Sequence, residues 1–519
     1  MSGRLSLAAT GIQGRWITEE PQYSHFLSRF RRHTKFAFEQ IEIPFEKFKE
    51  YGSEMTCRIP NNAGDLIKNM NLAIDLPSPS PPPDFNKTYE LTVDGSGFIY
   101  LDGNQVDRLN IYMGATYVFH HTEPFTLSLT PGGAAVSIPA LPDAYTVVED
   151  PPGQFTTTIN VPITSYFTPP TTNIPSYENT GISTLVLYRN SNSGHFMVLA
   201  VRQLRWNTST PTKMIQYADL IIGGQTIQRI TGEYIYMHNQ LTYTNDDQTL
   251  GLISTTLHNR YPIINDNVYY LYTRLTKYKV NLPFYFKNFP SLAIPTCALK
   301  AQQVEVKIKF RPVDDLVVDF DLQTLVYGPM VGTSGGASVE LRSMSLYTEF
   351  VYLSELEKSF IRTRPIEYVI TQTQVAEIKM APGVSKRAVM INFEHPVKEL
   401  FFICTNTYMN KQVKIKHATL KFNNHVVIDA DQLQLMDEQP LRHHTSGIRS
   451  EYPFGVYSFS MDPERYYPTG QVNMSRVIHK LLEVEIDNTG YTNLEHTVRV
   501  YASNYNVLRV NGGIAGLKF

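Results

Sequence analysis

Histidine pairs and cysteines are the side chains of this 519-residue sequence best suited to hold a metal ion. His120-His121 and His195 fall in one β-rich segment, and His443-His444 lies much later in the chain. A blue-copper site needs a cysteine thiolate beside two histidines, but that segment contains no cysteine; the three cysteines are Cys57, Cys297 and Cys404. Histidines on strands are more often packed or exposed than ligating, so we expect no metal and no cofactor.

Motifs of known catalytic sites do not point to an enzyme. The chain has no His-Glu-x-x-His, no Cys-x-x-Cys and no phosphate loop. Gly223-Gly224 is not followed by Lys-Ser/Thr, so we interpret it as a tight turn between two strands, where glycine tolerates positive φ. An odd number of widely spaced cysteines fits neither a disulfide framework nor a zinc site and favours a reducing compartment.

A basic cluster near the start, Arg29, Arg31, Arg32, His33 and Lys35, has two interpretations. It could contact a membrane or a genome, or it could begin a strand that is solvated or touches another subunit, and we favour the second. The formal charge of the whole chain is −2, from 46 basic and 48 acidic residues. Such a chain lacks the basic field on which non-specific DNA binding depends, so no direct nucleic-acid partner is expected.

The composition indicates a β-rich protein with much covered surface. Charged residues make up 18% of the chain, against about 25% in ordinary soluble proteins, while Tyr and Phe number 32 and 27. No apolar run approaches the roughly 20 residues of a membrane-spanning helix, and residues 1–16 lack the apolar region of a signal peptide. We expect a soluble protein.

Alternation of apolar and polar residues, which is typical of half-buried strands, dominates the sequence. It predicts strands near 38–48, 54–60, 68–76, 214–230, 242–250, 280–287, 301–311 and 339–353. Tyr234, Met237 and Leu241 share one helical face, and Ser354 with Glu357 forms a capping box that predicts a helix over 354–362.

Two breaks in composition bracket an insert. The proline run PSPSPPPD ends at residue 84, and the polar run NTSTPT ends at residue 212.

The segments 282–310 and 456–487 repeat one order of strand, proline loop and alternating strand, each followed by a long final strand. We therefore predict an all-β chain of two tandem eight-stranded jelly rolls. The predicted domains are an N-terminal arm at 1–30, a first jelly roll at 31–353 interrupted by a β-sandwich insert at 84–212, a connector helix at 354–363, a second jelly roll at 364–511 and a C-terminal tail at 512–519.

Six motifs occur in the order found in one known family: 30–38 (FRRHTKFAF), 64–77 (GDLIKNMNLAIDLP), 218–242 (ADLIIGGQTIQRITGEYIYMHNQLT), 282–286 (LPFYF), 393–400 (FEHPVKEL) and 468–476 (PTGQVNMSR). With these, the chain resembles the major capsid proteins of the nucleocytoplasmic large DNA viruses. The residues that carry the resemblance, and that we expect to be structural, are Arg31, Arg32, His33, Gly64, Asp65, Leu66, Gly223, Gly224, Pro396, Pro468, Gly470, Asn473, Ser475 and Arg476.

This resemblance implies a double jelly roll that forms a homotrimer, a pseudo-hexagonal capsomer of an icosahedral shell. It implies neighbouring capsomers, penton and minor capsid proteins as partners, an inner viral membrane approached by the N-terminal arm, and a virion assembled in the host cytoplasm. The insert resembles a cupredoxin-like β module and, placed in the loop between the third and fourth jelly-roll strands (D and E), is expected to face outward. The alternative function is that of a carbohydrate-binding attachment protein with a β-sandwich fold.

Overall fold

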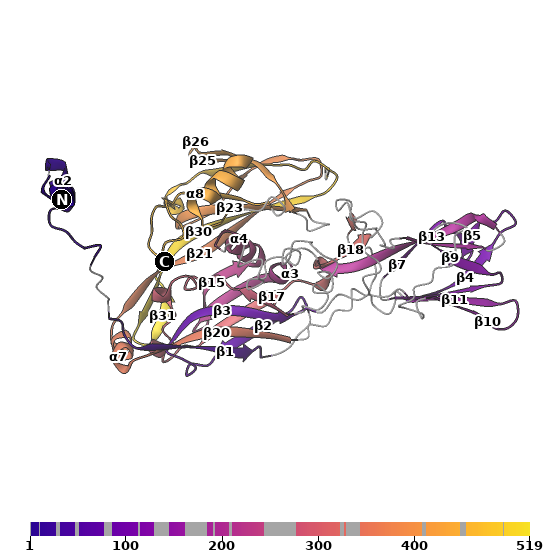
Figure 1. Ribbon diagram of the computed structural model, residues 1–519, viewed down its shortest axis with the longest axis horizontal. Coiled ribbons are helices and arrows are strands. Elements are labelled where there is room, and N and C mark those ends of the chain that lie inside the picture. Colours follow the sequence, from indigo (N-terminus) through magenta and orange to yellow (C-terminus); the bar gives the residue numbers. More distant parts are fainter. Residues whose placement is uncertain are drawn as a thin grey trace.

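Two large β-sandwiches lie side by side, and a smaller sandwich projects from one end of them (Figure 1). The computed structural model describes residues 2–9, 11–26, 32–46, 51–76, 86–112, 115–128, 145–160, 184–189, 192–206, 210–242, 277–321, 326–328, 343–406, 412–446, 453–490 and 492–519.

The first large sandwich consists of two four-stranded antiparallel sheets. One has the order β1-β20-β3-β16, with bounds Phe36–Pro44, Ser343–Leu353, Leu66–Asp75 and Lys277–Asn281. The other has the order β15-β14-β17-β2, with bounds Gln225–Thr231, Ile215–Ile222, Val304–Phe310 and Glu54–Ile59. Lettered B to I along the chain, these strands form a B-I-D-G sheet and an F-E-H-C sheet, which is the jelly-roll arrangement. In β17 every second residue is buried, as the alternating sequence predicts.

The second large sandwich repeats this topology. Its B-I-D-G sheet is built on β21-β30-β23, with bounds Ile366–Met380, His496–Asn511 and Pro396–Asn406. β27 (Gly455–Ser458), β28 (Val472–Asn473) and β24 (Gln412–Val413) pair with β23, and β31 (Ile514–Leu517) pairs with β30. The facing sheet has the order β22-β29-β25-β26, with bounds Lys386–Met390, Lys480–Ile486, Ile415–Phe422 and His425–Asp431. The fold is therefore an all-β double jelly roll, as predicted.

The projecting sandwich is built from two separate parts of the chain. One sheet has the order β10-β11-β8-β4-β5-β6, with bounds Tyr145–Glu149, Phe155–Asn160, Thr116–His121, Lys87–Val93, Ile99–Leu101 and Asn104–Gln105. The other contains β7 (Arg108–Tyr112), β9 (Phe125–Ser128), β12 (Thr184–Arg189) and β13 (Asn192–Trp206), and it is extended by β18 (Val317–Asp321) and β19 (Val326–Gly328). The predicted insert, 84–212, leaves out this last pair, which comes from the loop between strands H and I.

Helices connect the sheets and cover their edges. α4 (Gly232–Thr242) follows strand F of the first jelly roll, and the π-helix η6 (Gln434–Glu438) with α8 (Gln439–His443) follows strand F of the second. α7 (Glu355–Thr363) joins the jelly rolls, and α3 (Thr210–Lys213) precedes β14. α1 (Ser2–Ala8) and α2 (Ile12–Thr18) belong to the N-terminal arm, which stands away from the sandwiches in Figure 1. Short 3₁₀ helices are η3 (Pro290–Leu292), η4 (Thr296–Ala298), η5 (Val313–Asp315) and η7 (Met474–Arg476). None of the helices in the described ranges is long and apolar enough to cross a membrane.

Two local predictions were wrong, and a third falls almost entirely outside the described residues. The predicted strand 280–287 ends at Asn281, and the LPFYF segment turns, because Pro283 cannot donate to a ladder and its apolar neighbours are buried as a loop. Ser354 makes no side-chain cap on α7, so the predicted capping box does not form. The predicted strand 242–250 lies outside the described residues except for Thr242, which ends α4.

Candidate functional site

The seam between the two jelly rolls contains a group of buried polar and charged side chains. α4 of the first jelly roll packs on the B-I-D-G sheet of the second, and residues of both belong to one continuous apolar core. The ring of Tyr234 lies 5.7 Å edge-on from Phe401 and 6.3 Å from Tyr501. These aromatic contacts place the first turn of α4 directly over strands β23 and β30.

A part-buried ion network crosses this seam. Glu233, at the start of α4, accepts from Arg311 at 2.5 Å and from Arg499 of β30 at 3.2 Å. Arg499 also pairs with Glu377 at 2.7 Å. Burial raises the pKa of Glu233, but the charges of Arg311 and Arg499 outweigh it, and the pKa is lowered overall. The carboxylate is therefore ionised and fixes α4 to the second jelly roll.

Side chains of β21 complete the seam by bonding to the backbone of β15. The amide of Gln372 donates to the carbonyl oxygen of Ile227 at 2.6 Å, and the hydroxyl of Thr373 donates to that of Arg229 at 2.7 Å. Strand F of the first jelly roll is therefore covered by strand B of the second.

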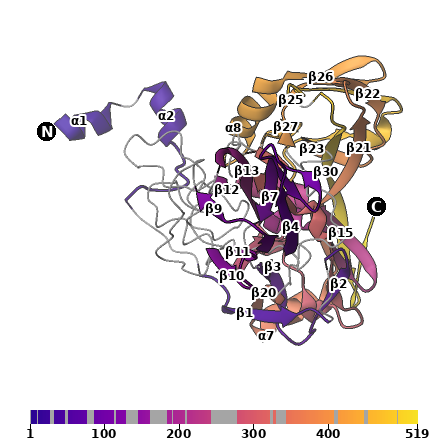
Figure 2. The ribbon, with the colours of Figure 1, turned by 90° about the vertical axis from the view of Figure 1, so that its right-hand side faces the viewer.

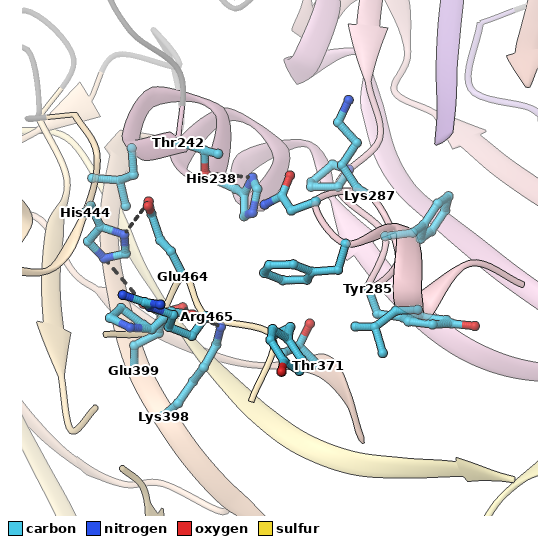
Figure 3. A pocket seen from close by; sticks show the side chains of 18 of the residues that line it. His238, Thr242, Tyr285, Lys287, Thr371, Lys398, Glu399, His444, Glu464 and Arg465 are labelled. Carbon is cyan, nitrogen blue, oxygen red and sulfur yellow. Dashed lines mark hydrogen bonds and ion pairs between the residues drawn. The ribbon is translucent and has the colours of Figure 1, made fainter. Parts of the chain in front are cut away.

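A small cavity lies beside this network, between α4 and the loop after β27 (Figure 3). His444 lies between two carboxylates, 3.4 Å from Glu399 and 3.3 Å from Glu464. Lys398 donates to the carbonyl oxygen of Pro463 at 2.8 Å. The figure shows His238 facing this group from α4.

The charges around the cavity compensate one another. Burial lowers the pKa of His444, but the neighbouring carboxylates of Glu399 and Glu464 outweigh it and raise the pKa to about 9. Burial raises the pKa of Glu399, while Lys398 and His444 lower it to about 2. Burial and Lys398 lower the pKa of His238 to about 4. At neutral pH two cations therefore face two carboxylates beside a neutral His238.

The cavity has a volume of about 60 Å³, which gives room for a few water molecules, since each needs roughly 10–15 Å³. That volume is too small for a nucleotide or a sugar. Among the described residues no group of three or more His, Cys, Asp or Glu is placed to hold a metal ion. The arrangement can fix the two jelly rolls and the loop after β27, and this is what its geometry supports.

The predicted signature Gly64-Asp65-Leu66 lies where β3 begins. A Cβ on Gly64 would come within 2.6 Å of the Cβ of Phe350, so only glycine allows this approach. The carboxylate of Asp65 accepts from the backbone of Leu353 at 2.9 Å and pairs with Lys358 of α7 at 3.3 Å. This contact holds α7 without the predicted cap.

Two distant signature motifs meet in the second jelly roll. Pro396 pairs with Asn473 across β23 and β28, and the hydroxyl of Ser475 accepts from the backbone of His395 at 2.8 Å. The side chain of Asn473 caps η7 by accepting from the backbone of Ser475 at 3.1 Å. Gly470 has φ 148°, and a Cβ there would lie 2.7 Å from the carbonyl oxygen of Phe459. Pro468 and Arg476 are exposed on either side of this contact.

The remaining predicted residues are spread over the molecule. Gly223 and Gly224 form the turn between β14 and β15 with φ 58° and 83°. Arg31 lies outside the described residues, and Arg32 and His33 are exposed.

The candidate metal and thiol residues are likewise separate. His120 bonds to Thr156, the buried His121 bonds to Thr157, and His195 lies on β13. Cys57 and Cys404 are buried in different cores, where burial raises the pKa of each thiol to about 12.

The seam residues Glu233, Arg499 and His444 were not singled out as a network by the sequence. Glu233 lies inside the 218–242 motif, but its partner Arg499 is 266 positions away. No local pattern signals such a pair.

Comparison with known proteins identifies the family. A model described as "Major capsid protein N-terminus" matches residues 24–123 and 183–354, and one described as "Large eukaryotic DNA virus major capsid protein" matches residues 357–516. The chain belongs to the major capsid proteins of large eukaryotic DNA viruses. It is thus a structural protein of the icosahedral capsid, and the comparisons give no support to the carbohydrate-binding alternative.

Relatives agree with this assignment, and solved structures share the fold. The capsid protein is 23% identical to the major capsid protein of Pyramimonas orientalis virus, covering 100% of this chain and 99% of the relative. It is 25% identical to that of Paramecium bursaria Chlorella virus 1 over 59% of this chain and 79% of the relative. The fold matches the PBCV-1 capsid with a TM-score of 0.58, 16% identity and coverage of 96% and 100%. It matches the Faustovirus major capsid protein with a TM-score of 0.57, 11% identity and coverage of 97% and 94%.

Proposed function

We propose that this capsid protein assembles as a homotrimer, a pseudo-hexagonal capsomer that contacts neighbouring capsomers, penton proteins and minor capsid proteins. The observation that carries the proposal is the pair of jelly rolls of one topology joined by a buried seam. Three copies around an axis give six similar positions, which suits a six-fold lattice. Obligate contacts of this kind bury more than about 2,000 Å².

The mass of the purified protein in dilute buffer tests this proposal. Light scattering after size-exclusion chromatography should give three times the 59.1 kDa chain mass. A monomer that persists at micromolar concentration would contradict it.

We propose that the N-terminal arm contacts the inner viral membrane. Its two helices expose Leu5, Ile12 and Trp16 at 76%, 81% and 87%, and Arg4 and Arg15 lie among them without an acidic residue before Glu19. Exposed apolar side chains beside cations favour an anionic bilayer surface. Vesicles of phosphatidylcholine with phosphatidylserine should sediment the full chain but not a chain that lacks residues 1–26. Equal sedimentation of both proteins would refute the proposal.

We propose that the projecting sandwich faces away from the virion interior and covers the capsomer top. Support comes from its position, since Figure 1 shows it at the end opposite α7 and the C-terminus. Because β18 and β19 pair into its sheet, the test removes 84–212 and 317–328 together, with Gly/Ser linkers. The shortened protein should keep the trimer mass and lose its outer projection in electron micrographs. If neither jelly roll folds in the shortened protein, the projecting sandwich is not an independent module and the proposal is refuted.

We propose that the signature residues from Gly64 to Arg476 are structural. Their contacts in turns and strand starts support this role, whereas the role of Arg31 rests on the sequence alone.

We also propose assembly in the host cytoplasm, which the free thiols favour. Fluorescence microscopy of infected cells would detect nuclear accumulation, the result that contradicts this location.

A further inference from the structure

We propose that strand β26 of one copy packs against strand β1 of the next copy, in the way that β15 packs against β21 within a chain. The proposal rests on the proposed trimer and names the two surfaces that would form it. Its basis is a residue-by-residue equivalence between the two jelly rolls. The contact of β15 with β21 forms within the chain, whereas the equivalent surfaces on β26 and β1 do not meet within the chain.

The two F strands correspond with a constant offset. In the first jelly roll, the register with strand E shifts after Leu220, and Ile221 then faces Thr226. In the second, it shifts after Leu420, and Lys421 then faces Val426. Each residue of β15 is therefore equivalent to the residue of β26 numbered 200 higher.

The two B strands correspond through a shared irregularity in strand D. The I–D register skips Lys68 in the first jelly roll and Lys398 in the second. The residues beside these bulges, Glu349 and Ser503, pair with Gln40 of β1 and Thr373 of β21 respectively. Gln40 is thus the counterpart of Thr373, which bonds to β15 within the chain.

Equivalent positions differ sharply in exposure. Ile227 on β15 is fully buried because β21 covers it, whereas its counterpart Val427 is 38% exposed. Leu433, the counterpart of Glu233, is 65% exposed. On the receiving side Ile370 of β21 is fully buried, whereas its counterpart Ala37 on β1 is exposed.

The receiving sheet is more polar than its counterpart in the second jelly roll. The counterparts of the seam residues Tyr501 and Phe401 are Tyr347 and Asn71, and both are only half-buried. Polar Asn71 replaces an aromatic ring, so the second seam has fewer apolar contacts than the first. We expect it to dissociate before the chain unfolds.

Geometry allows this contact to close a ring. In Figures 1 and 2, β26 and β1 lie on opposite sides of the paired jelly rolls. A surface that binds a different surface on the next copy produces a closed ring when the rotation closes. Each copy would then use β26 once and β1 once.

Disulfide trapping tests the contact in the full-length chain. The double variant Gln40→Cys with Asp429→Cys places thiols at the counterparts of Thr373 and Arg229. Within the chain, the hydroxyl oxygen of Thr373 lies 2.7 Å from the backbone carbonyl oxygen of Arg229. Both positions are exposed. Mild oxidation should yield covalent dimers and then trimers on non-reducing gels, and reductant should reverse them.

Two matched double variants calibrate the result. Thr373→Cys with Arg229→Cys should form a bond within one chain. Gln40→Cys with Met390→Cys uses an exposed residue at the opposite edge of the β26 sheet and should give no covalent trimer.

The outcomes separate this inference from the trimer itself. A covalent trimer only with the Asp429 pair supports both. A trimer by light scattering without crosslinks, or equal crosslinking with Met390, overturns the β26–β1 contact alone. A monomer overturns the contact together with the trimer. As a second readout, Val427→Arg should raise the dissociation constant of the trimer at least about tenfold, whereas Met390→Arg should not; equal effects would overturn the contact.

Discussion

The ion network at Glu233 gives the sharpest test of how the two jelly rolls are joined. Glu233→Gln keeps the shape of the side chain but removes the negative charge between Arg311 and Arg499. Removing one partner of a buried pair costs about 3–5 kcal/mol. The two arginines are 20% and 21% exposed and Arg499 keeps Glu377, so solvent screening reduces the expected loss to about 3 kcal/mol.

Thermal unfolding of the purified protein measures this loss. A domain of this size shifts its Tm by about 2–4 °C per kcal/mol, so the melting transition of the jelly rolls should fall by about 6–12 °C. The matched control is Glu367→Gln, which removes an exposed carboxylate whose partners Lys518 and Arg509 lie at 3.4 and 3.8 Å. An exposed pair contributes about 0–1 kcal/mol. If Glu233→Gln and the control variant have the same melting temperature, the stability of the seam does not depend on this network.

Two further predictions follow from the site and the turns. The pKa of His444 is raised to about 9 in the folded protein, so its stabilisation is complete below the unfolded value of about 6.5 and is lost as the pH rises through about 9. The Tm difference between the parent and His444→Gln should therefore be large at pH 6 and small at pH 10; a difference independent of pH would contradict the ion pairs. Gly64→Ala should destabilise by about 1–3 kcal/mol through overpacking against Phe350, whereas Gly95→Ala, with open space around it, should be nearly neutral in urea unfolding. Equal unfolding midpoints for the two variants would contradict this prediction.

The jelly-roll strands could be predicted because their signal is local. In β17 and β29 the alternating residues lie next to one another in the sequence, and every second side chain is buried. The same holds for α4, where Tyr234, Met237 and Leu241 are all buried on the predicted helix. Period and length were enough to place these elements within a few residues.

The pairing of strands that lie far apart in the sequence could not be predicted from local patterns. β18 joins the projecting sandwich by pairing Arg202 with Asp321, and nothing in a segment of five residues says which sheet it will extend. The LPFYF segment shows the complementary error. Its apolar residues correctly indicated burial, but burial in a loop between two domains resembles burial in a strand when only the sequence is considered.

The continuous apolar run Leu400–Cys404 indicates that both faces of strand β23 are buried, one of them in the seam. All residues of β23 after Pro396 are buried, so this strand lacks the wet face that alternation implies. Leu400 and Phe402 belong to the inner core of the second jelly roll, while Phe401 and Ile403 belong to the core shared with the first. A strand that is buried on both sides needs a continuous apolar sequence, because each face packs on a different layer. The second jelly roll would therefore expose an apolar sheet face if it stood alone, and α4 with the LPFYF segment covers that face. This explains why the two jelly rolls fold against each other although a short exposed helix is their direct link.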